Sequence, residues 1–157
     1  MSPMDVSARR RVGGAVVLAV LAGSALTGCQ QSEQERRADY CKAIADASAT
    51  LTRTADEGGA GAFLDALPIL EELAQGSPSD LKDEWQTYLT SLRNLRDVLA
   101  EIAVDPEELA DGVPTRLSKA ERQRVRGAVR NVRSVETRQA AQGITQQALD
   151  VCDVQIL

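Results

Sequence analysis

The sequence predicts an all-α fold, a small helical bundle of about four main helices with short helical segments between them. Aromatic residues make up only 3% of the chain, whereas strands prefer aromatic and β-branched side chains. The apolar residues are mostly Ala, Leu and Val, which suit closely packed helices. In residues 77–104, apolar side chains alternate at four- and three-residue spacing, so they share one helix face: Leu81, Trp85, Tyr88, Leu92, Leu95, Leu99 and Ile102.

We expect residues 77–104 to form the central helix of this bundle. Ser77 is expected to cap it, with Asp80 completing a capping box and Pro78 at the first helical position. The helix should end before Asp105-Pro106, because the residue that precedes a proline avoids helical backbone angles.

Two helices are expected before the central one. The first stops at Gly58-Gly59 and carries inward residues at helical spacing, namely Tyr40, Ile44, Ala47 and Leu51. The second covers residues 62–75, with Phe63 among its inward side chains. Pro68 either kinks this second helix or restarts it, and the sequence does not decide between the two.

Capping boxes also predict the helices that follow the central one. Asp105 and Glu108 should open a short helix that ends at Gly112, and Ser118 and Glu121 should open a long helix reaching residue 142. One face of the long helix is apolar and carries Val125, Ala128, Val129, Val132 and Val135. Gly143 should interrupt it, and residues 144–152 should form a last helical segment.

The N-terminus has the pattern of an export signal. Arg9, Arg10 and Arg11 precede an apolar run of 15 residues, 12–26, which suits a secretory signal better than a membrane span. The run ends in Leu26-Thr27-Gly28-Cys29. This resembles the lipobox of bacterial lipoproteins, in which the signal is cut before a cysteine that receives a diacylglyceryl group. An ordinary signal peptide with a chance cysteine is the alternative.

The lipobox resemblance implies a division of the chain into three parts. Residues 1–28 would be the signal peptide, and residues 29–37, a polar stretch, would tether the protein to its lipid on Cys29. Residues 38–157 would form the helical domain on the extracytoplasmic face of the cell membrane. Cys41 and Cys152 would then remain as an even pair in an oxidising compartment, so we predict a disulfide between them; two buried free thiols are the alternative.

A second resemblance covers the first half of the domain. Tyr40-Cys41, residues 67–74 and residues 77–85, together with Cys152 near the C-terminus, resemble small helical lipoproteins of actinobacteria. That group is largely uncharacterised. The resemblance therefore implies a fold and a location, and no activity.

Few residues offer catalytic chemistry. The chain has no histidine, which excludes histidine-activated nucleophiles and the common zinc sites. Carboxylates that adjoin in sequence, such as Glu71-Glu72, Asp83-Glu84 and Glu107-Glu108, point about 100° apart on a helix and form no dyad. We therefore predict no catalysis, no cofactor and no metal.

Charge is divided unevenly along the chain. Residues 54–111 hold 14 acidic and three basic side chains, whereas residues 116–138 hold eight basic and two acidic ones. Five of the basic residues form a basic stripe along one helix: Lys119, Arg122, Arg126, Arg130 and Arg133. The stripe is either a solvated flank that complements the acidic helices or a contact for anionic lipid or an envelope polymer. Nucleic acid is a poor candidate, because the domain is acidic and lacks stacking aromatics.

From these features we expect a non-catalytic module of the cell envelope, held to the membrane by its lipid, that contacts an envelope protein partner. Binding of anionic lipid or polymer through the basic stripe is the first alternative. A hydrolase that works through two carboxylates facing one cleft is the second.

Overall fold

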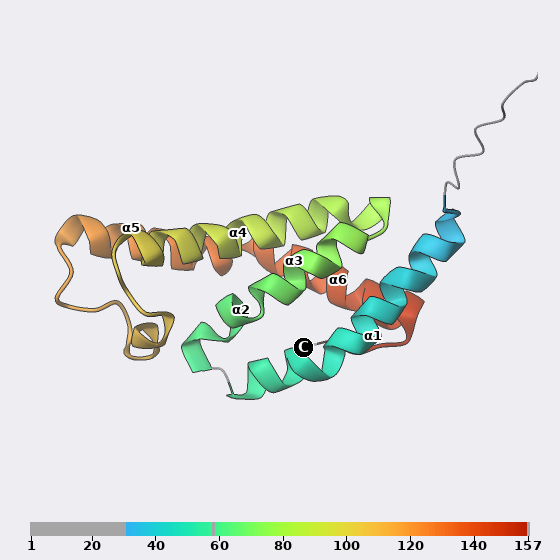
Figure 1. Cartoon of the computed structure of the whole chain (residues 1–157). Helices are drawn as coiled ribbons and strands as arrows, with labels where there is room; N and C mark the ends of the chain where they lie inside the picture. Colours follow the sequence, from blue (N-terminus) through green and yellow to red (C-terminus); the bar gives the residue numbers. More distant parts are fainter. Residues whose placement is uncertain (1–30, 58, 157) are drawn as a thin grey trace, which may run out of the picture. The chain divides into compact units, whose positions relative to one another are not determined.

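The computed structural model describes residues 31–57 and 59–156, and this part of the chain is all-α (Figure 1). No strand occurs within it. Its α-helices are α1 (Glu33–Glu57), α2 (Ala62–Asp65), α3 (Leu67–Gly76), α4 (Lys82–Glu101), α5 (Lys119–Val132) and α6 (Val135–Cys152). Three short 3₁₀ helices join them, namely η1 (Gly59–Gly61), η2 (Ser79–Leu81) and η3 (Pro106–Asp111).

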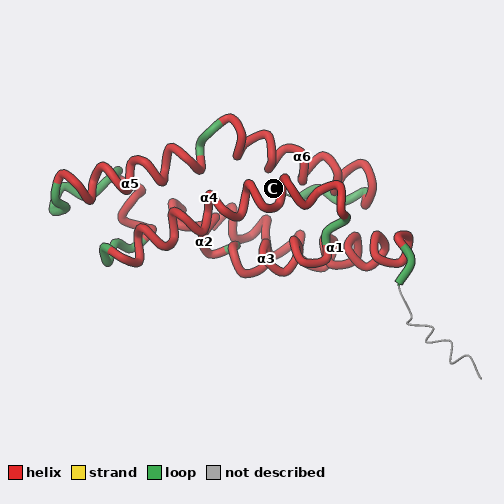
Figure 2. Tube along the Cα trace, turned by 90° about the horizontal axis from the view of Figure 1, so that it is seen from above, coloured by secondary structure: helices red, strands yellow, loops and turns green. Residues whose placement is uncertain are grey.

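Helix α4 is the centre of the bundle, as predicted. It packs against α3, α5 and α6, and Figure 2 shows it running between the α5–α6 pair and the α2–α3 segment. Of its expected inward residues, five are buried and two are half-buried, Leu95 and Ile102. The α4 side chains belong to both buried clusters of the domain, so this one helix joins the two halves of the core.

The predicted disulfide is present. Cys41 on α1 and Cys152 at the end of α6 are bonded, with their Cα atoms 5.0 Å apart. The bond joins residues 111 positions apart in the chain. The bridge and both buried clusters lie within residues 31–156. This part also forms one compact unit, so we expect residues 31–157 to fold alone, as a domain with its own core does.

Helix α1 begins earlier than expected, at Glu33, so the last five residues of the expected tether are helical. A capping box of Ser32 with Glu35, which we did not predict, explains this start. The Glu35 amide donates to Ser32 Oγ at 3.2 Å, and the Ser32 amide donates to Glu35 Oε2 at 2.8 Å. The hydrogen bond from the Ser32 amide is the main cause that lowers the pKa of the Glu35 carboxyl. The side chains of residues 33–37 are exposed.

Pro68 restarts the helix and does not kink it. Helix α2 ends at Asp65, and Pro68 sits in the first turn of α3, where its missing N–H leaves no bond unmade. The break turns the α2 residue Phe63 outward, with 50% of its surface exposed. Its predicted place in the core is therefore wrong, whereas Tyr40, Trp85 and Tyr88 are buried as predicted.

The predicted ends of the central helix need correction. The Ser77 hydroxyl donates to the Ala74 carbonyl at 2.8 Å, so it serves the end of α3 and does not cap α4. At the other end, Ala103 adopts a left-handed backbone with φ of 51°. The Val104 amide bonds the Leu99 carbonyl at 3.0 Å, which is a Schellman ending. Helix α4 therefore ends at Glu101 through this motif, and not through the effect of Pro106 on the residue before it.

The capping boxes of Asp105 with Glu108 and of Ser118 with Glu121 are both confirmed. The expected long helix is divided at Ser134, whose hydroxyl accepts from the Thr137 amide at 3.1 Å and caps α6. Val135 is consequently exposed, against our prediction. Gly143 does not interrupt α6.

Gly143 instead allows α4 to approach α6. A Cβ atom on Gly143 would lie only 3.2 Å from Glu84 Cγ, tighter than an ordinary van der Waals contact. The conformational cost of a glycine inside a helix is thus offset by closer packing of the two helices.

Candidate ligand-binding cavity

The described residues form an apolar cavity of about 730 Å³. This volume lies within the range of small-molecule sites, about 300–1,000 Å³. Helix α4 supplies Tyr88, Leu92 and Leu95, α5 and its C-cap residue supply Val129, Val132 and Arg133, and α6 supplies Thr137, Arg138 and Ala141. The remaining wall comes from the α2, η1 and η3 region, with Gly59, Phe63, Leu109, Gly112 and Val113.

Phe63 is the large apolar side chain of this wall that is most open to solvent. The other apolar lining residues are buried or half-buried. An aromatic ring at an apolar cavity offers a contact surface to a ligand at little cost in conformational entropy. The restart of the helix at Pro68 thus places Phe63 where it borders the cavity.

Segments η1 and η3 are joined by a hydrogen bond at the edge of this wall. The Gly61 amide donates to Glu107 Oε1 at 3.0 Å. A Cβ atom on Gly61 would lie 2.4 Å from the same oxygen, and one on Gly59 would lie 2.8 Å from Glu107 Oε2. A side chain at either position would therefore push the Glu107 carboxylate away and disturb the hydrogen bond that joins the two segments.

Tyr88 is the most buried ionisable side chain of the lining, with 7% of its surface exposed. Burial raises the pKa of its hydroxyl to about 12, because the interior disfavours the phenolate. Next to it, the Ser91 hydroxyl donates to the Tyr88 carbonyl at 2.7 Å. Tyr88 is therefore a neutral group at the cavity at physiological pH.

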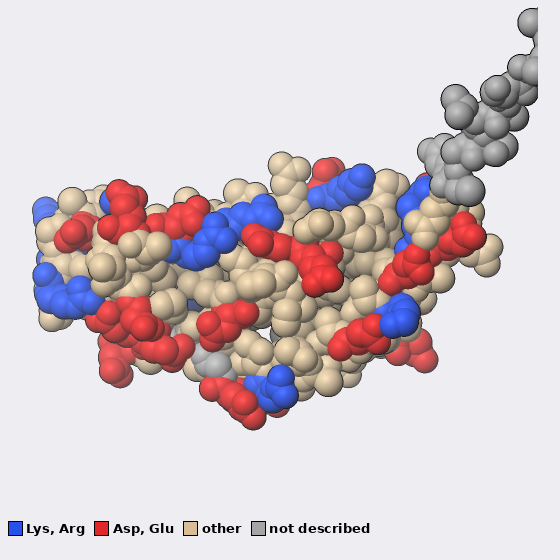
Figure 3. All heavy atoms as spheres, viewed as in Figure 1, with Lys and Arg blue, Asp and Glu red and all other residues tan. Residues whose placement is uncertain are grey.

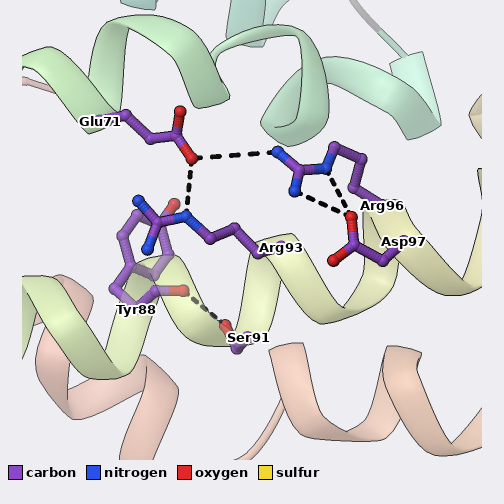
Figure 4. A network of polar contacts seen from close by, with 6 residues as sticks. All are labelled: Glu71, Tyr88, Ser91, Arg93, Arg96 and Asp97. Carbon is purple, nitrogen blue, oxygen red and sulfur yellow. Dashed lines mark hydrogen bonds and ion pairs between the residues drawn. The ribbon is translucent and has the colours of Figure 1, made fainter.

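An exposed charge network ties α4 to α3 beside Tyr88 (Figure 4). Arg93 Nε donates to Glu71 Oε1 at 2.7 Å, and Arg96 pairs with Asp97 at 2.8 Å while lying 3.9 Å from Glu71. Ion pairs this exposed contribute about 0–1 kcal/mol each. The network therefore links α4 to α3 and contributes little to stability.

Arg133 and Arg138 are the two charged residues of the cavity lining. Both are exposed. Within residues 31–57 and 59–156, neither forms an ion pair with a carboxylate, whereas Arg93, Arg116 and Arg124 do. Two cations without a carboxylate partner thus border an otherwise apolar cavity.

The structure separates the members of the basic stripe. The Arg122 guanidinium donates to the backbone carbonyls of Leu117 and Thr115, so it holds the loop before α5. Arg133 lines the cavity. Lys119, Arg126 and Arg130 are exposed, and in the described part of the chain they form no ion pair.

Two other basic residues near the stripe meet the acidic helices. Arg116 bonds both oxygens of Glu108, at 2.7 and 2.8 Å, and Arg124 bonds the carboxylate of Glu101. These hydrogen bonds lower the pKa of both carboxyl groups. Acidic and basic side chains are accordingly interspersed on the face shown in Figure 3. Part of the charge imbalance seen along the sequence is thus compensated in space.

A second hollow, of about 520 Å³, lies between α4 and the junction of α5 with α6. It is polar, and its lining includes Thr87, Thr90 and Asn131. Its two carboxylates, Asp83 and Glu136, are exposed. Nothing here resembles a buried acid–base pair.

Three further observations bear on function. Residues 31–57 and 59–156 contain no cluster of three or more His, Cys, Asp or Glu side chains suited to a metal ion. None of the described helices is both long and apolar enough to span a bilayer. Comparison with known proteins gave no matching family model, no similar curated protein and no similar solved structure.

The cavity itself was not foreseen from the sequence. Cys29, the expected lipidation site, lies outside the described residues. Arg133 was singled out as part of the basic stripe, but Arg138 and Phe63 were not singled out as site residues. The chain's only phenylalanine gave no signal of its position, because an isolated aromatic at helical spacing is typical of a core.

Proposed function

We propose that this chain is an exported, lipid-anchored and non-catalytic binding protein of the cell envelope, whose ligand enters the apolar cavity. The observation that carries the proposal is the cavity of about 730 Å³ with its mainly apolar lining. Two further features support the location. The disulfide between Cys41 and Cys152 is typical of an oxidising compartment, and the Leu26-Thr27-Gly28-Cys29 sequence resembles a lipobox.

The composition of the lining favours binding over catalysis. The residues around the cavity include no carboxylate and no thiol, and the chain has no histidine. General acid–base and nucleophilic mechanisms draw mainly on those groups. The arginines, Thr137 and the neutral Tyr88 can orient a ligand but are poor proton-transfer groups at neutral pH.

Contact with an anionic surface is a second candidate function. Arg126 and Arg130 are exposed on α5 and pair with no carboxylate of the described residues. A lipid anchor would keep these arginines close to anionic head groups. Of the basic stripe, they and Lys119 would form this contact, because Arg122 bonds the backbone and Arg133 borders the cavity.

The cavity proposal can be tested with an uncharged apolar dye, N-phenylnaphthylamine, whose fluorescence rises in apolar surroundings. Residues 31–157, produced with the disulfide formed, should bind it at one saturable site. The variant Ala141→Phe places a ring in the cavity lining. If the ring displaces two methylene equivalents of contact, affinity should fall roughly tenfold.

Ala100→Phe is the matched control, because Ala100 is an exposed residue of α4 outside the cavity lining. It should bind the dye as the unchanged chain does. Absence of a saturable site, or equal affinity in Ala141→Phe, would contradict the proposal.

A further inference from the structure

We propose that the cavity takes a single-chain amphiphile with an anionic head group. The acyl chain would lie against the apolar lining, and the carboxylate or phosphate would lie beside Arg133 and Arg138. This inference rests on the proposed function, because it names the ligand class for the same cavity.

We infer an apolar chain in the ligand from the buried and half-buried apolar side chains that line the cavity. Leu92 is fully buried, and Leu95, Val129 and Val132 are half-buried. All four lie on the facing helices α4 and α5 and line the cavity. Water gains few hydrogen bonds against such a lining, so an apolar chain is favoured there over a polar molecule.

We infer an anionic head group from the positions of Arg133 and Arg138. Arg133 is the C-cap residue that follows α5, and Arg138 lies in the first turn of α6, so the α5–α6 break places both at the cavity. Arginine presents a planar fork of donors that matches carboxylate and phosphate oxygens. Both are exposed, so a head group could bind them while staying in contact with water.

Charge complementarity distinguishes this pair from other arginines of the domain. Arg93, Arg116 and Arg124 already bond carboxylates. Arg133 and Arg138 pair with no carboxylate in residues 31–57 and 59–156, although acidic residues outnumber basic ones in the chain, 23 to 18. An anionic head group would supply the partner that the described residues do not.

The test is displacement of bound N-phenylnaphthylamine from residues 31–157 by decanoate and by decanol, at about pH 8, where the carboxylic acid is ionised. Both ligands are used below their aggregation limits. Decanoate should bind roughly tenfold more tightly than decanol, as expected for charge-assisted hydrogen bonds to a head group. Each added methylene should tighten binding about fourfold while the chain still fits.

The double variant Arg133→Gln/Arg138→Gln should remove the preference for decanoate, because decanoate binding should weaken by much more than decanol binding. Saturable decanol binding also shows that the variant is folded. The matched control is Arg126→Gln/Arg130→Gln, which changes two exposed arginines of α5 outside the cavity lining and should keep the preference.

Lysophosphatidylglycerol provides a second arm, because a phospholipid and a free fatty acid present the same chemistry from different sources. Compared at equal acyl-chain length, tighter binding of one of them than of the other would identify the source. Equal affinity for decanoate and decanol, or a preference that survives Arg133→Gln/Arg138→Gln, would overturn the inference while dye binding upheld the proposed function. Failure of the dye to bind would overturn the proposed function itself.

Discussion

Removing the Cys41–Cys152 bridge is expected to lower the free energy of unfolding by about 4–5 kcal/mol. The bridge spans 111 residues, and a cross-link over a loop of that length restricts the unfolded chain by about this amount on the chain-entropy model. Typical domains are stable by only about 5–15 kcal/mol. The double variant Cys41→Ala/Cys152→Ala should therefore be marginally folded.

Urea unfolding of residues 31–157, followed by far-ultraviolet circular dichroism, measures this loss. Reduction of the unchanged chain should give a similar midpoint, which separates the effect of the cross-link from that of the new alanines. A loss below about 1 kcal/mol would mean that the unfolded chain gains little freedom when the bridge is removed.

Trp85→Ala is expected to cost about 3–5 kcal/mol, the range for a large aromatic removed from a close-packed core. Trp85 is only 2% exposed and lies in the larger buried cluster with Tyr40 and Leu92. Its indole N–H donates to the Tyr40 hydroxyl at 3.2 Å, and both groups are buried. Alanine would lose both the packing and this hydrogen bond.

Phe63→Ala is the matched comparison, because it makes a similar change at a half-exposed ring and should cost about 1 kcal/mol or less. Tyr40→Phe isolates the hydrogen bond and should cost about 1–3 kcal/mol, since it leaves the indole N–H buried without an acceptor. Equal losses for Trp85→Ala and Phe63→Ala in urea unfolding would contradict the assigned core.

Local rules were sufficient to predict much of this fold. The alternation from Leu81 to Ile102 predicted the central helix because helical periodicity places those side chains on one face. The capping boxes that begin at Asp105 and Ser118 were predictable from a short polar residue followed three positions later by a glutamate. In this pattern the side chain of each residue accepts a hydrogen bond from the backbone N–H of the other. The disulfide followed from the number of cysteines left and the expected compartment.

The errors occurred where tertiary contacts outweigh local preference. Gly143 was expected to break a helix, but close packing against Glu84 keeps it inside α6. Ser134 was not predicted as a helix cap, because the residue three positions later is Thr137 and not the glutamate of a capping box. The end of α4 was misplaced because the buried pair of Leu99 and Val104 favours a left-handed Ala103, which no sequence rule anticipates.

The cavity could not be predicted at all. Its walls come from four segments, residues 59–63, 88–95, 109–113 and 129–141, and their meeting is a property of the packed domain. Within each segment, the lining residues have the same spacing as core residues. Only packing decides which apolar side chains fill space and which leave it open.

The intact mass of the full chain, extracted from membranes in detergent and alkylated with and without prior reduction, tests export and anchoring most directly. Export would supply the oxidising compartment in which the disulfide forms. We expect a chain that begins at Cys29 with a diacylglyceryl adduct, and two further alkylation sites that react only after reduction. An unprocessed chain with three reactive thiols would contradict export and anchoring.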